Sequence, residues 1–248
     1  MKQFLYLLIF FPFIFSCETP QLTAQDIVDK TIEASGGTTY QNAEVDFDFR
    51  DKHYHSIRDG GNFQYEREFK DSIGTIKDVL RNDGFERYVN NELANIPDSM
   101  AVKYAASVNS VHYFAMLPYG LNDASVNKSN LGDVTIKNKL YHKIKVTFNQ
   151  DGGGEDYEDT FIYWINTETF KTEYLAYSYM ESDGFGLRFR EAYNERIVNG
   201  LRFVDYNNFE PKDTTTKLMG LDTAFEAGKV SLLSKIELKH IEVHNLPN

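Results

Sequence analysis

Small and apolar residues near the start of the folded chain follow a helical period. They recur at intervals of three and four, at Ala24, Ile27, Val28, Thr31 and Ala34. This spacing is typical of a helix that buries one face. Thr23 and Asp26 form a capping-box start, and Gly36-Gly37 supplies a stop for the C-terminal end. The pattern predicts a helix over residues 24–35.

The period changes from helical to two after the glycine pair. Apolar Val45, Phe47 and Phe49 alternate with Asp46, Asp48 and Arg50. Such alternation is typical of a strand with one buried face. Comparable runs, separated by turn pairs such as Asn199-Gly200, predict further strands around 53–58, 62–69, 76–81 and 85–90, and again from residue 134 onward, including 161–165, 174–179, 186–194, 200–209 and 234–244.

A second helical pattern separates the two groups of strands. It starts at Asp98, which can cap the helix, and continues to about Leu117, where Pro118 ends it. A leading helix, a mid-chain helix and a long antiparallel meander predict an α+β fold with a strongly curved antiparallel sheet. We expect a single domain over residues 23–248.

Two of the predicted strands are apolar or aromatic on both faces, namely 161–165 and 174–179. A sheet with one face in water should instead alternate. Either helices and loops cover this part of the sheet twice, or one of its faces lines an apolar cavity. The first alternative is favoured, because large apolar residues are most often simply buried.

The first sixteen residues have the layout of a signal peptide. Lys2 precedes an apolar run of about 12 residues, or about 18 Å of helix, which is too short for a bilayer core of about 30 Å. No other stretch is apolar enough to span a membrane. Ile14-Phe15-Ser16-Cys17 resembles the lipobox of bacterial lipoproteins, although Phe15 departs from its usual pattern. The resemblance implies that residues 1–16 are removed and that Cys17 becomes an acylated N-terminus.

Lipidation at Cys17 would make residues 17–22 a lipidated cysteine followed by a short tether. Two or more acyl chains anchor a protein stably to a bilayer. Glu18 is not the Asp usually linked to inner-membrane retention, so the resemblance favours the outer membrane, on its periplasmic face or at the cell surface. The alternative is a plain secreted protein in which Cys17 is unmodified.

Composition narrows the possible functions. The 248 residues include 26 Lys+Arg and 37 Asp+Glu, a net charge of -11. This balance argues against nucleic acid as a partner, because a phosphate backbone requires basic patches. The single cysteine excludes a disulfide framework and a metal site built on several thiolates.

An exported chain with a capped helix ending in Gly-Gly and a long meander resembles the LolA/LolB-like superfamily of lipoprotein carriers and receptors. The resemblance implies an incomplete β-barrel around a hydrophobic cavity, with the helices as its cover. Three segments, 111–121, 163–165 with 174–177, and 188–193, also resemble uncharacterised lipoproteins of the Bacteroidota. That group has no known function, so the resemblance supplies no catalytic residues.

A lipid or acyl chain held in the half-barrel is the ligand that the LolA-like resemblance implies. Period two does not show which face is concave, so the candidate wall residues come from both faces. They are Phe47, Phe49, Phe161, Tyr163, Trp164, Tyr177, Phe189 and Phe203. Arg188 and Arg190 share a strand face and could receive an anionic headgroup. Pairing with acidic residues on neighbouring strands is the more common role for such arginines.

Histidines raise the question of a metal site. His53 and His55 lie on one face of a predicted strand, and Asp51 is expected on that same face. Two His and a carboxylate suit zinc or iron, but a two-residue spacing is weakly specific. We therefore expect exposed strand histidines, also at His240 and His244, and we assign no metal and no cofactor.

The sequence thus favours a membrane-anchored binding module over an enzyme. No Gly-x-Ser-x-Gly motif or other catalytic constellation stands out, and no catalytic residue is assigned. Two alternatives stay open: an envelope hydrolase or lyase on the same scaffold, and a structural or docking lipoprotein. The expected partners are a hydrophobic small molecule or lipid and, through acylated Cys17, a membrane; no protein partner is identified.

Overall fold

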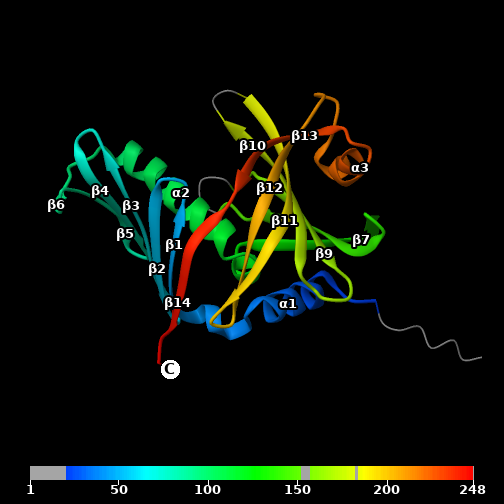
Figure 1. Cartoon of the computed structure of the whole chain (residues 1–248), viewed down its shortest axis with the longest axis horizontal. Helices are drawn as coiled ribbons and strands as arrows, with labels where there is room; N and C mark the ends of the chain where they lie inside the picture. Colours follow the sequence, from blue (N-terminus) through cyan, green and yellow to red (C-terminus); the bar gives the residue numbers. More distant parts are fainter. Residues whose placement is uncertain (1–20, 152–156, 182–183, 248) are drawn as a thin grey trace, which may run out of the picture.

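The structure is a computed structural model that describes residues 21–151, 157–181 and 184–247 (Figure 1). The predicted signal peptide, Cys17 and the first part of the tether lie outside the described residues. None of the helices within the described ranges combines the length and the apolar character needed to cross a bilayer.

Helix α1 (Ala24–Ser35) begins and ends as predicted. The Asp26 N–H donates to Thr23 Oγ1 (3.1 Å), and the Thr23 N–H donates to Asp26 Oδ2 (2.9 Å), which completes the capping box. Gly36 ends the helix with φ of +138°, and a Cβ there would come within 2.6 Å of the Leu201 side chain. Glycine is therefore required at this position for its backbone angle and for the close contact.

Fourteen strands form two antiparallel sheets in the described part of the chain. The first has the order β14 (Leu238–Asn245), β1 (Asn42–Phe49), β2 (Lys52–Asp59), β3 (Asn62–Asp71), β4 (Gly74–Arg81), β5 (Gly84–Val89), β6 (Glu92–Leu93). The second has the order β13 (Val230–Ile236), β12 (Leu201–Pro211), β11 (Gly184–Val198), β10 (Thr172–Glu181), β9 (Thr160–Asn166), β8 (Lys139–Phe148), β7 (Val126–Ile136). The predicted α+β class with an open, curved antiparallel meander is confirmed.

The predicted strand 234–244 is wrong as a single element. The chain leaves the second sheet after β13 and enters the first as β14, with Glu237 between them. At this crossing the Leu238 N–H donates to Asp205 Oδ1 (3.0 Å), and the same carboxylate accepts hydrogen bonds from Arg196 (2.8 Å) and Asn194 (2.6 Å). The chain changes sheets here without a glycine or proline, because the Asp205 carboxylate accepts the Leu238 N–H that has no strand partner at this point.

Strand β7 and helix α2 also begin differently from the prediction. β7 starts at Val126, eight residues before the predicted return of alternation at 134, because this edge strand exposes polar residues and lacks a clear apolar face. Helix α2 (Asp98–Ala115) has Pro97 as its N-cap, so Asp98 lies in the first turn instead of capping it.

Helices α1 and α2 contribute to one core cluster with residues of both sheets, and we call the face of the sheets that lines this cluster the inner face. Helix α2 packs on β3, β4 and β5, and its last turn reaches β9 of the second sheet (Figure 1). Ile27 of α1 and Val108 of α2 share a core cluster with Phe47 of β1 and Tyr163 of β9. Helix α3 (Leu221–Glu226) covers the opposite face of the second sheet. Strands β9 and β10 are therefore packed on both faces over most of their length, as the first of the two alternatives predicts, although Phe161 and Tyr177 stay half-buried on the inner face.

A buried ion-pair network joins α2 to the first sheet. Asp78 of β4 is fully buried and accepts hydrogen bonds from Arg67 (2.6 Å) and Arg87 (2.6 Å) of the neighbouring strands. Arg67 also donates to Ser107 Oγ of α2 (2.7 Å), and the Arg87 guanidinium lies 3.4 Å from the ring centroid of Tyr104. Both arginines thus connect one carboxylate to the helix above it.

Replacing Asp78→Asn should strongly destabilise the fold, because the buried guanidinium of Arg67 and the half-buried one of Arg87 lose their counter-charge. We expect the free energy of unfolding to fall by about 3–5 kcal/mol in urea denaturation followed by circular dichroism. Asp83→Asn, in an exposed turn between β4 and β5, is the matched control and should change stability little. Equal stabilities of the two variants would contradict the network's role.

Candidate ligand-binding face

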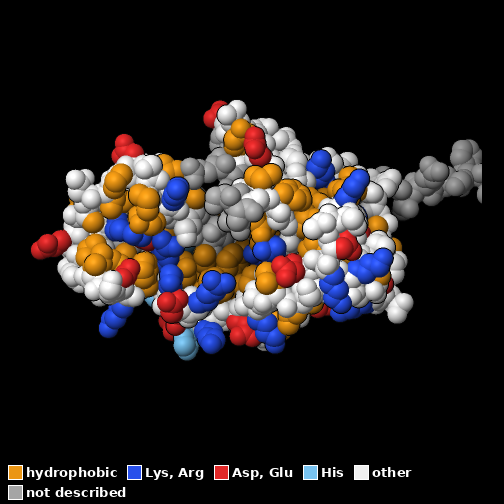
Figure 2. All heavy atoms as spheres, turned by 90° about the horizontal axis from the view of Figure 1, so that it is seen from above, with side chains coloured by type: hydrophobic (Ala, Val, Ile, Leu, Met, Phe, Trp, Pro, Cys, Tyr) orange, Lys and Arg blue, Asp and Glu red, His pale blue; other side chains and the backbone are white. Residues whose placement is uncertain are grey.

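Half-buried aromatic side chains gather on the inner face where the last turn of α2 meets β8, β9 and β10. We call them the aromatic platform: Tyr113, Phe114, Phe148, Phe161 and Tyr177. Phe161 is at their centre, with ring centroids 6.2 Å from Tyr113, 5.8 Å from Phe148 and 5.3 Å from Tyr177. From above, hydrophobic side chains gather between the two sheets with Lys and Arg side chains beside them (Figure 2).

Arg190 of β11 borders the platform and lies among aromatic rings. Its guanidinium is 5.3 Å from the ring centroid of Phe114, 5.0 Å from that of Tyr177 and 6.0 Å from that of Tyr206. Its Nη2 donates to the Tyr177 hydroxyl (2.9 Å), whereas its buried Nε has no hydrogen-bond partner among the described residues. Arg190 therefore has donor capacity left to bind an anion.

Arg188 differs from Arg190 in having an acidic neighbour. Its Nη1 lies 3.9 Å from Glu210 Oε2, and its guanidinium is 5.1 Å from the ring centroid of Tyr179. Within the described ranges, no carboxylate comes within 4.0 Å of the Arg190 guanidinium. Of the two arginines, Arg188 is thus the one that pairs with an acidic residue, Glu210, on the neighbouring strand.

Tyr113 connects the platform to a second tyrosine beneath it. The Tyr113 and Tyr163 hydroxyl oxygens are 3.2 Å apart, and Tyr163 is fully buried. Burial raises the pKa of Tyr113 to about 12, so its hydroxyl is neutral at physiological pH. The base of the platform is accordingly uncharged, and Arg188 and Arg190 supply positive charge at its border.

The structure separates the eight predicted wall residues into two groups. Trp164 and Phe189 lie on the far face, in the cluster beneath α3. The others belong to the inner cluster, where only Phe161 and Tyr177 are half-buried and Phe49 contacts Phe114 at 5.3 Å between ring centroids. The fully or largely buried members of the inner group are Phe47, Phe49, Tyr163 and Phe203.

Sequence reasoning missed Tyr113, Phe114 and Phe148 as platform residues. Tyr113 and Phe114 lie within a helix predicted only as a cover, and helical periodicity alone does not show which residues of its last turn stay half-exposed. Phe148 ends a strand whose alternation was recognised, but local pattern does not show that its ring meets Phe161 of the neighbouring strand.

Trp164 has a structural role on the far face. Its Nε1–H donates to Asp222 Oδ2 of α3 (3.1 Å), and Lys143 Nζ donates to the same oxygen (2.6 Å). The pair of hydrogen bonds attaches α3 to the second sheet and satisfies a buried indole N–H.

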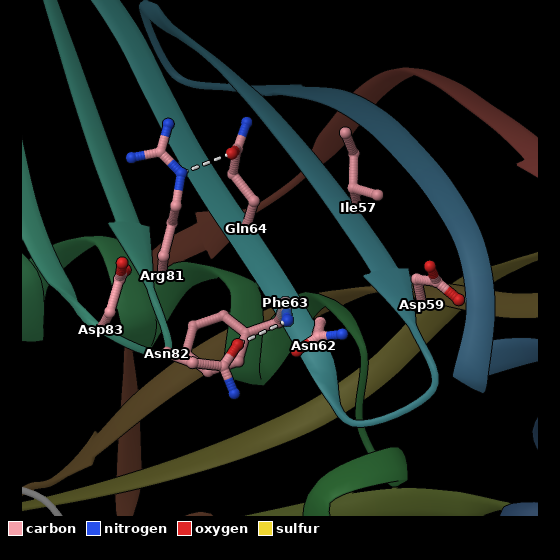
Figure 3. A pocket seen from close by; sticks show the side chains of 8 residues that line it. All are labelled: Ile57, Asp59, Asn62, Phe63, Gln64, Arg81, Asn82 and Asp83. Atoms are coloured by element: carbon pink, nitrogen blue, oxygen red, sulfur yellow. Dashed lines mark hydrogen bonds between the residues drawn. The ribbon is translucent and has the colours of Figure 1, made fainter.

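Two surface pockets lie away from the platform. One, of about 430 Å³, is formed by the turns and outward side chains of the β2–β3 and β4–β5 hairpins (Figure 3). There Arg81 Nε donates to Gln64 Oε1 (2.6 Å), and the Phe63 N–H donates to Asn82 Oδ1 (2.8 Å). The other, of about 270 Å³, lies between α1, η1 (Gly37–Gln41) and η2 (Tyr119–Asn122). Neither contains a predicted wall residue, so the platform is the better candidate.

Histidines and carboxylates form a row on the outer face of the first sheet, opposite α2. His53 of β2 lies between Asp48 (Nδ1–Oδ1, 2.9 Å) and Asp46 (Nε2–Oδ1, 3.2 Å). His55 contacts Asp46 (Nδ1–Oδ1, 2.9 Å), and His240 of β14 contacts Asp48 (Nδ1–Oδ2, 2.6 Å). We call these residues, with Glu44, the histidine–carboxylate row.

The row differs from the expected one in its acidic members. Asp51 lies in the β1–β2 turn and pairs with Lys52 (3.0 Å), because the chain reverses at Arg50 with φ of +57°. The carboxylates come instead from β1, whose residues stand opposite His53 and His55 in register. Although burial opposes the charged forms, mutual hydrogen bonding raises the pKa of His53 and lowers that of Asp48.

Sequence comparison with protein families matches residues 1–238 to a family of unknown function, DUF6503. The chain belongs to this family. Comparison with curated proteins gives no significant match. The family assignment therefore leaves the function to be argued from the residues of the structure.

Solved structures similar to this member of the family come from several bacteria. A LolA superfamily protein from Nitrosomonas europaea shares 12% identity, with 92% of this chain and 95% of that chain covered and a TM-score of 0.48. A DUF1329 family protein from Desulfovibrio piger shares 6% identity over 89% and 92% of the chains (TM-score 0.39). A lipoprotein-sorting protein domain from Vibrio parahaemolyticus shares 5% identity over 82% and 84% (TM-score 0.31).

His112 of α2 is a buried histidine of the inner core. It stacks on Tyr65 with ring centroids 4.5 Å apart, and its edge meets Phe47 at 5.7 Å. Its Nε2–H donates to the Glu66 carbonyl (3.0 Å), since a carbonyl can only accept. Burial lowers the pKa of His112 to about 3, so this imidazole is neutral at physiological pH.

The low pKa of His112 should make stability depend on pH. In the unfolded chain His112 has a pKa of about 6.5, whereas in the folded protein its pKa is about 3. Between these pH values the unfolded state therefore binds one more proton than the folded state. The free energy of unfolding should therefore fall as the pH decreases from about 6.5 toward 3. In His112→Phe, this part of the pH dependence should disappear, while stability at neutral pH falls by about 1 kcal/mol through the lost hydrogen bond.

Urea midpoints of both proteins at about pH 7 and about pH 4.5 test this linkage, because every other titrating group is common to the two chains. An equal loss of stability between the two pH values in both proteins would show that His112 takes no part in it.

Proposed function

We propose that this protein is an envelope lipoprotein that binds an amphipathic, lipid-like ligand on its inner face. The acyl chain would lie on the aromatic platform, and an anionic group would meet Arg190. The observation that carries the proposal is a guanidinium set among three aromatic rings, with a buried Nε that has no partner among the described residues.

Apolar burial would supply most of the binding free energy. Half-buried rings still expose part of their surface, and each Å² that a ligand removes from water contributes about 25 cal/mol before ordering costs. Phe161 and Tyr177 stack at 5.3 Å and so present a rigid apolar wall. Aromatic walls that are ordered before binding lose little side-chain entropy when the ligand arrives.

Charge at the border would select the headgroup. An arginine surrounded by rings is less hydrated than one in open solvent, so its hydrogen bonds to a carboxylate or phosphate are stronger. Tyr177 holds the Arg190 guanidinium through a 2.9 Å hydrogen bond. The ligand is accordingly an acyl chain with an acidic end, and a neutral lipid of equal length should bind more weakly.

Attachment to the membrane would occur through acylated Cys17 and the tether that follows it. The lipobox-like residues Ile14 to Cys17 support this part of the proposal. Glu18 favours the outer membrane, on the periplasmic face or at the surface. A protein held at a bilayer by its own acyl chains is suited to receive or retain a lipid there, in agreement with a receptor-like role.

Binding of a dansylated fatty acid to the Cys17→Ser protein, which cannot be acylated, tests the site. We expect Arg190→Gln to weaken binding about tenfold, because a charge-assisted hydrogen bond contributes about 1.5–3 kcal/mol. Phe161→Ala should weaken it by a similar factor through lost apolar contact. The matched control is Phe185→Ala, since Phe185 is exposed on the same strand as Arg190.

A dansylated fatty alcohol separates the two contributions. It should lose affinity with Phe161→Ala and be nearly indifferent to Arg190→Gln. If the fatty acid binds all variants alike, or binds none including the parent protein, the platform is not the ligand site.

A further inference from the structure

Three carboxylates project from β1 onto the outer face, and none of them forms an ion pair with a lysine or arginine of the described residues. Glu44, Asp46 and Asp48 alternate with buried Ala43, Val45 and Phe47. In the part of the chain that the structure describes, their only ion-pair partners are imidazoles. By contrast, Glu66, which faces His55 from β3, is paired with Lys77 (2.7 Å). Within the described ranges, all three carboxylates of β1 are thus left without a lysine or arginine partner, whereas Glu66 on the other side of His55 has one.

Donor atoms in this part of the row converge closely. Glu44, Asp46 and His55 each offer one donor atom, and these atoms all lie within 4.8 Å of one another. Bonds of about 2.0–2.1 Å in a tetrahedral zinc site place neighbouring donors about 3.3 Å apart. His55 Nδ1 lies 2.9 Å from Asp46 Oδ1, and its other ring nitrogen, Nε2, lies 3.7 Å from Glu44 Oε1. Both carboxylates thus lie beside the same imidazole, of which an ion would take one nitrogen.

The rest of the row has the arrangement of an outer ligand shell. His53 contacts Asp46 with Nε2 and Asp48 with Nδ1. His53 thus orients Asp46, which would bind the ion, and Asp48 in turn orients His53. His240 then contacts the second oxygen of Asp48. Alternating imidazole and carboxylate groups of this kind fix the direction and basicity of metal ligands.

A β-bulge in β14 brings His240 to the row. The register between β1 and β14 shifts between Asp46 and Asp48, and His240 adopts φ of +51° there. Bulges re-aim side chains, and histidine tolerates this left-handed conformation better than most residues. In register, Asp48 stands opposite Lys239. The extra residue of the bulge turns the His240 imidazole toward Asp48 as well.

The geometry points to a binding site for a divalent transition-metal ion on the outer face, with Glu44, Asp46 and His55 as ligands and His53, Asp48 and His240 as their supporting partners. One imidazole with two carboxylates suits zinc and its neighbours in the transition series. The ligands are only partly exposed, with 19% of the His55 side chain and 24% of the Asp46 side chain accessible, so the ion would be held against the sheet with room for water as a further ligand.

Zinc titration of the Cys17→Ser protein, purified without a histidine tag, tests this site in competition with a chromophoric chelator. We expect one zinc ion per chain. Asp46→Asn and His55→Gln should abolish that binding, and His53→Gln, which removes a supporting partner, should weaken it about ten- to hundredfold. The control is His142→Gln, because His142 forms a similar pair with Asp133 (2.7 Å) on β7 and β8 but belongs to no cluster of three donors in the described residues.

Zinc protection of the parent protein provides a readout that needs no variant. Zinc should protect His55 from diethyl pyrocarbonate, as read by mass spectrometry, and should leave His142 equally reactive with and without the ion. Failure to bind zinc, binding that survives Asp46→Asn and His55→Gln in folded protein, or equal modification of His55 in both states would overturn the assignment.

Discussion

The packing of α2 on the first sheet, with its last turn against the second, is the constraint on which the inner face depends. A curved sheet that turns large apolar side chains inward must cover them, and α2 does so with Val108, Val111 and Ala115. The helix is also attached by polar contacts, since Asp78 holds two arginines that reach Ser107 and Tyr104. Because the same helix ends in Tyr113 and Phe114, its attachment to the first sheet fixes where the aromatic platform of the second sheet is completed.

The two faces of the molecule offer different chemistry. On the inner face, rings from α2 and the second sheet surround a single arginine, an environment that favours an acyl chain with an acidic end. On the outer face, three carboxylates of β1 meet imidazoles from β2 and β14, an environment that favours a cation. Strand alternation produces both, since Phe47 faces α2 while Asp46 and Asp48, on either side of it, face outward.

Local pattern predicted much of the fold and less of the site. The helix over 24–35 and most strands follow from periodicity and turn residues, because short-range sterics decide them. The crossing at Glu237 and the short helix α3 were missed, since a distant carboxylate holds the first and the burial of Trp164 and Phe189 fixes the second. Phe161, Tyr177 and Arg190 were among the candidates, but their neighbours Tyr113 and Phe114 come from a helix whose position only tertiary packing determines. The row was likewise hidden, because Asp46, His55 and His240 belong to three different strands.

Strand β14 has a consequence for the order in which the chain acquires its structure. It pairs with β1 in a register that joins Ala43 to Asn245, so the first strand finds its second neighbour only when almost the whole polypeptide is available. Pairings between such distant segments form slowly, because a long loop must be closed before the contacts compensate for it. Until then, one edge of β1 has open backbone donors and acceptors, a template for adhesion between chains. A nascent or C-terminally shortened polypeptide would therefore be most vulnerable to aggregation at the strand that carries Asp46 and Asp48.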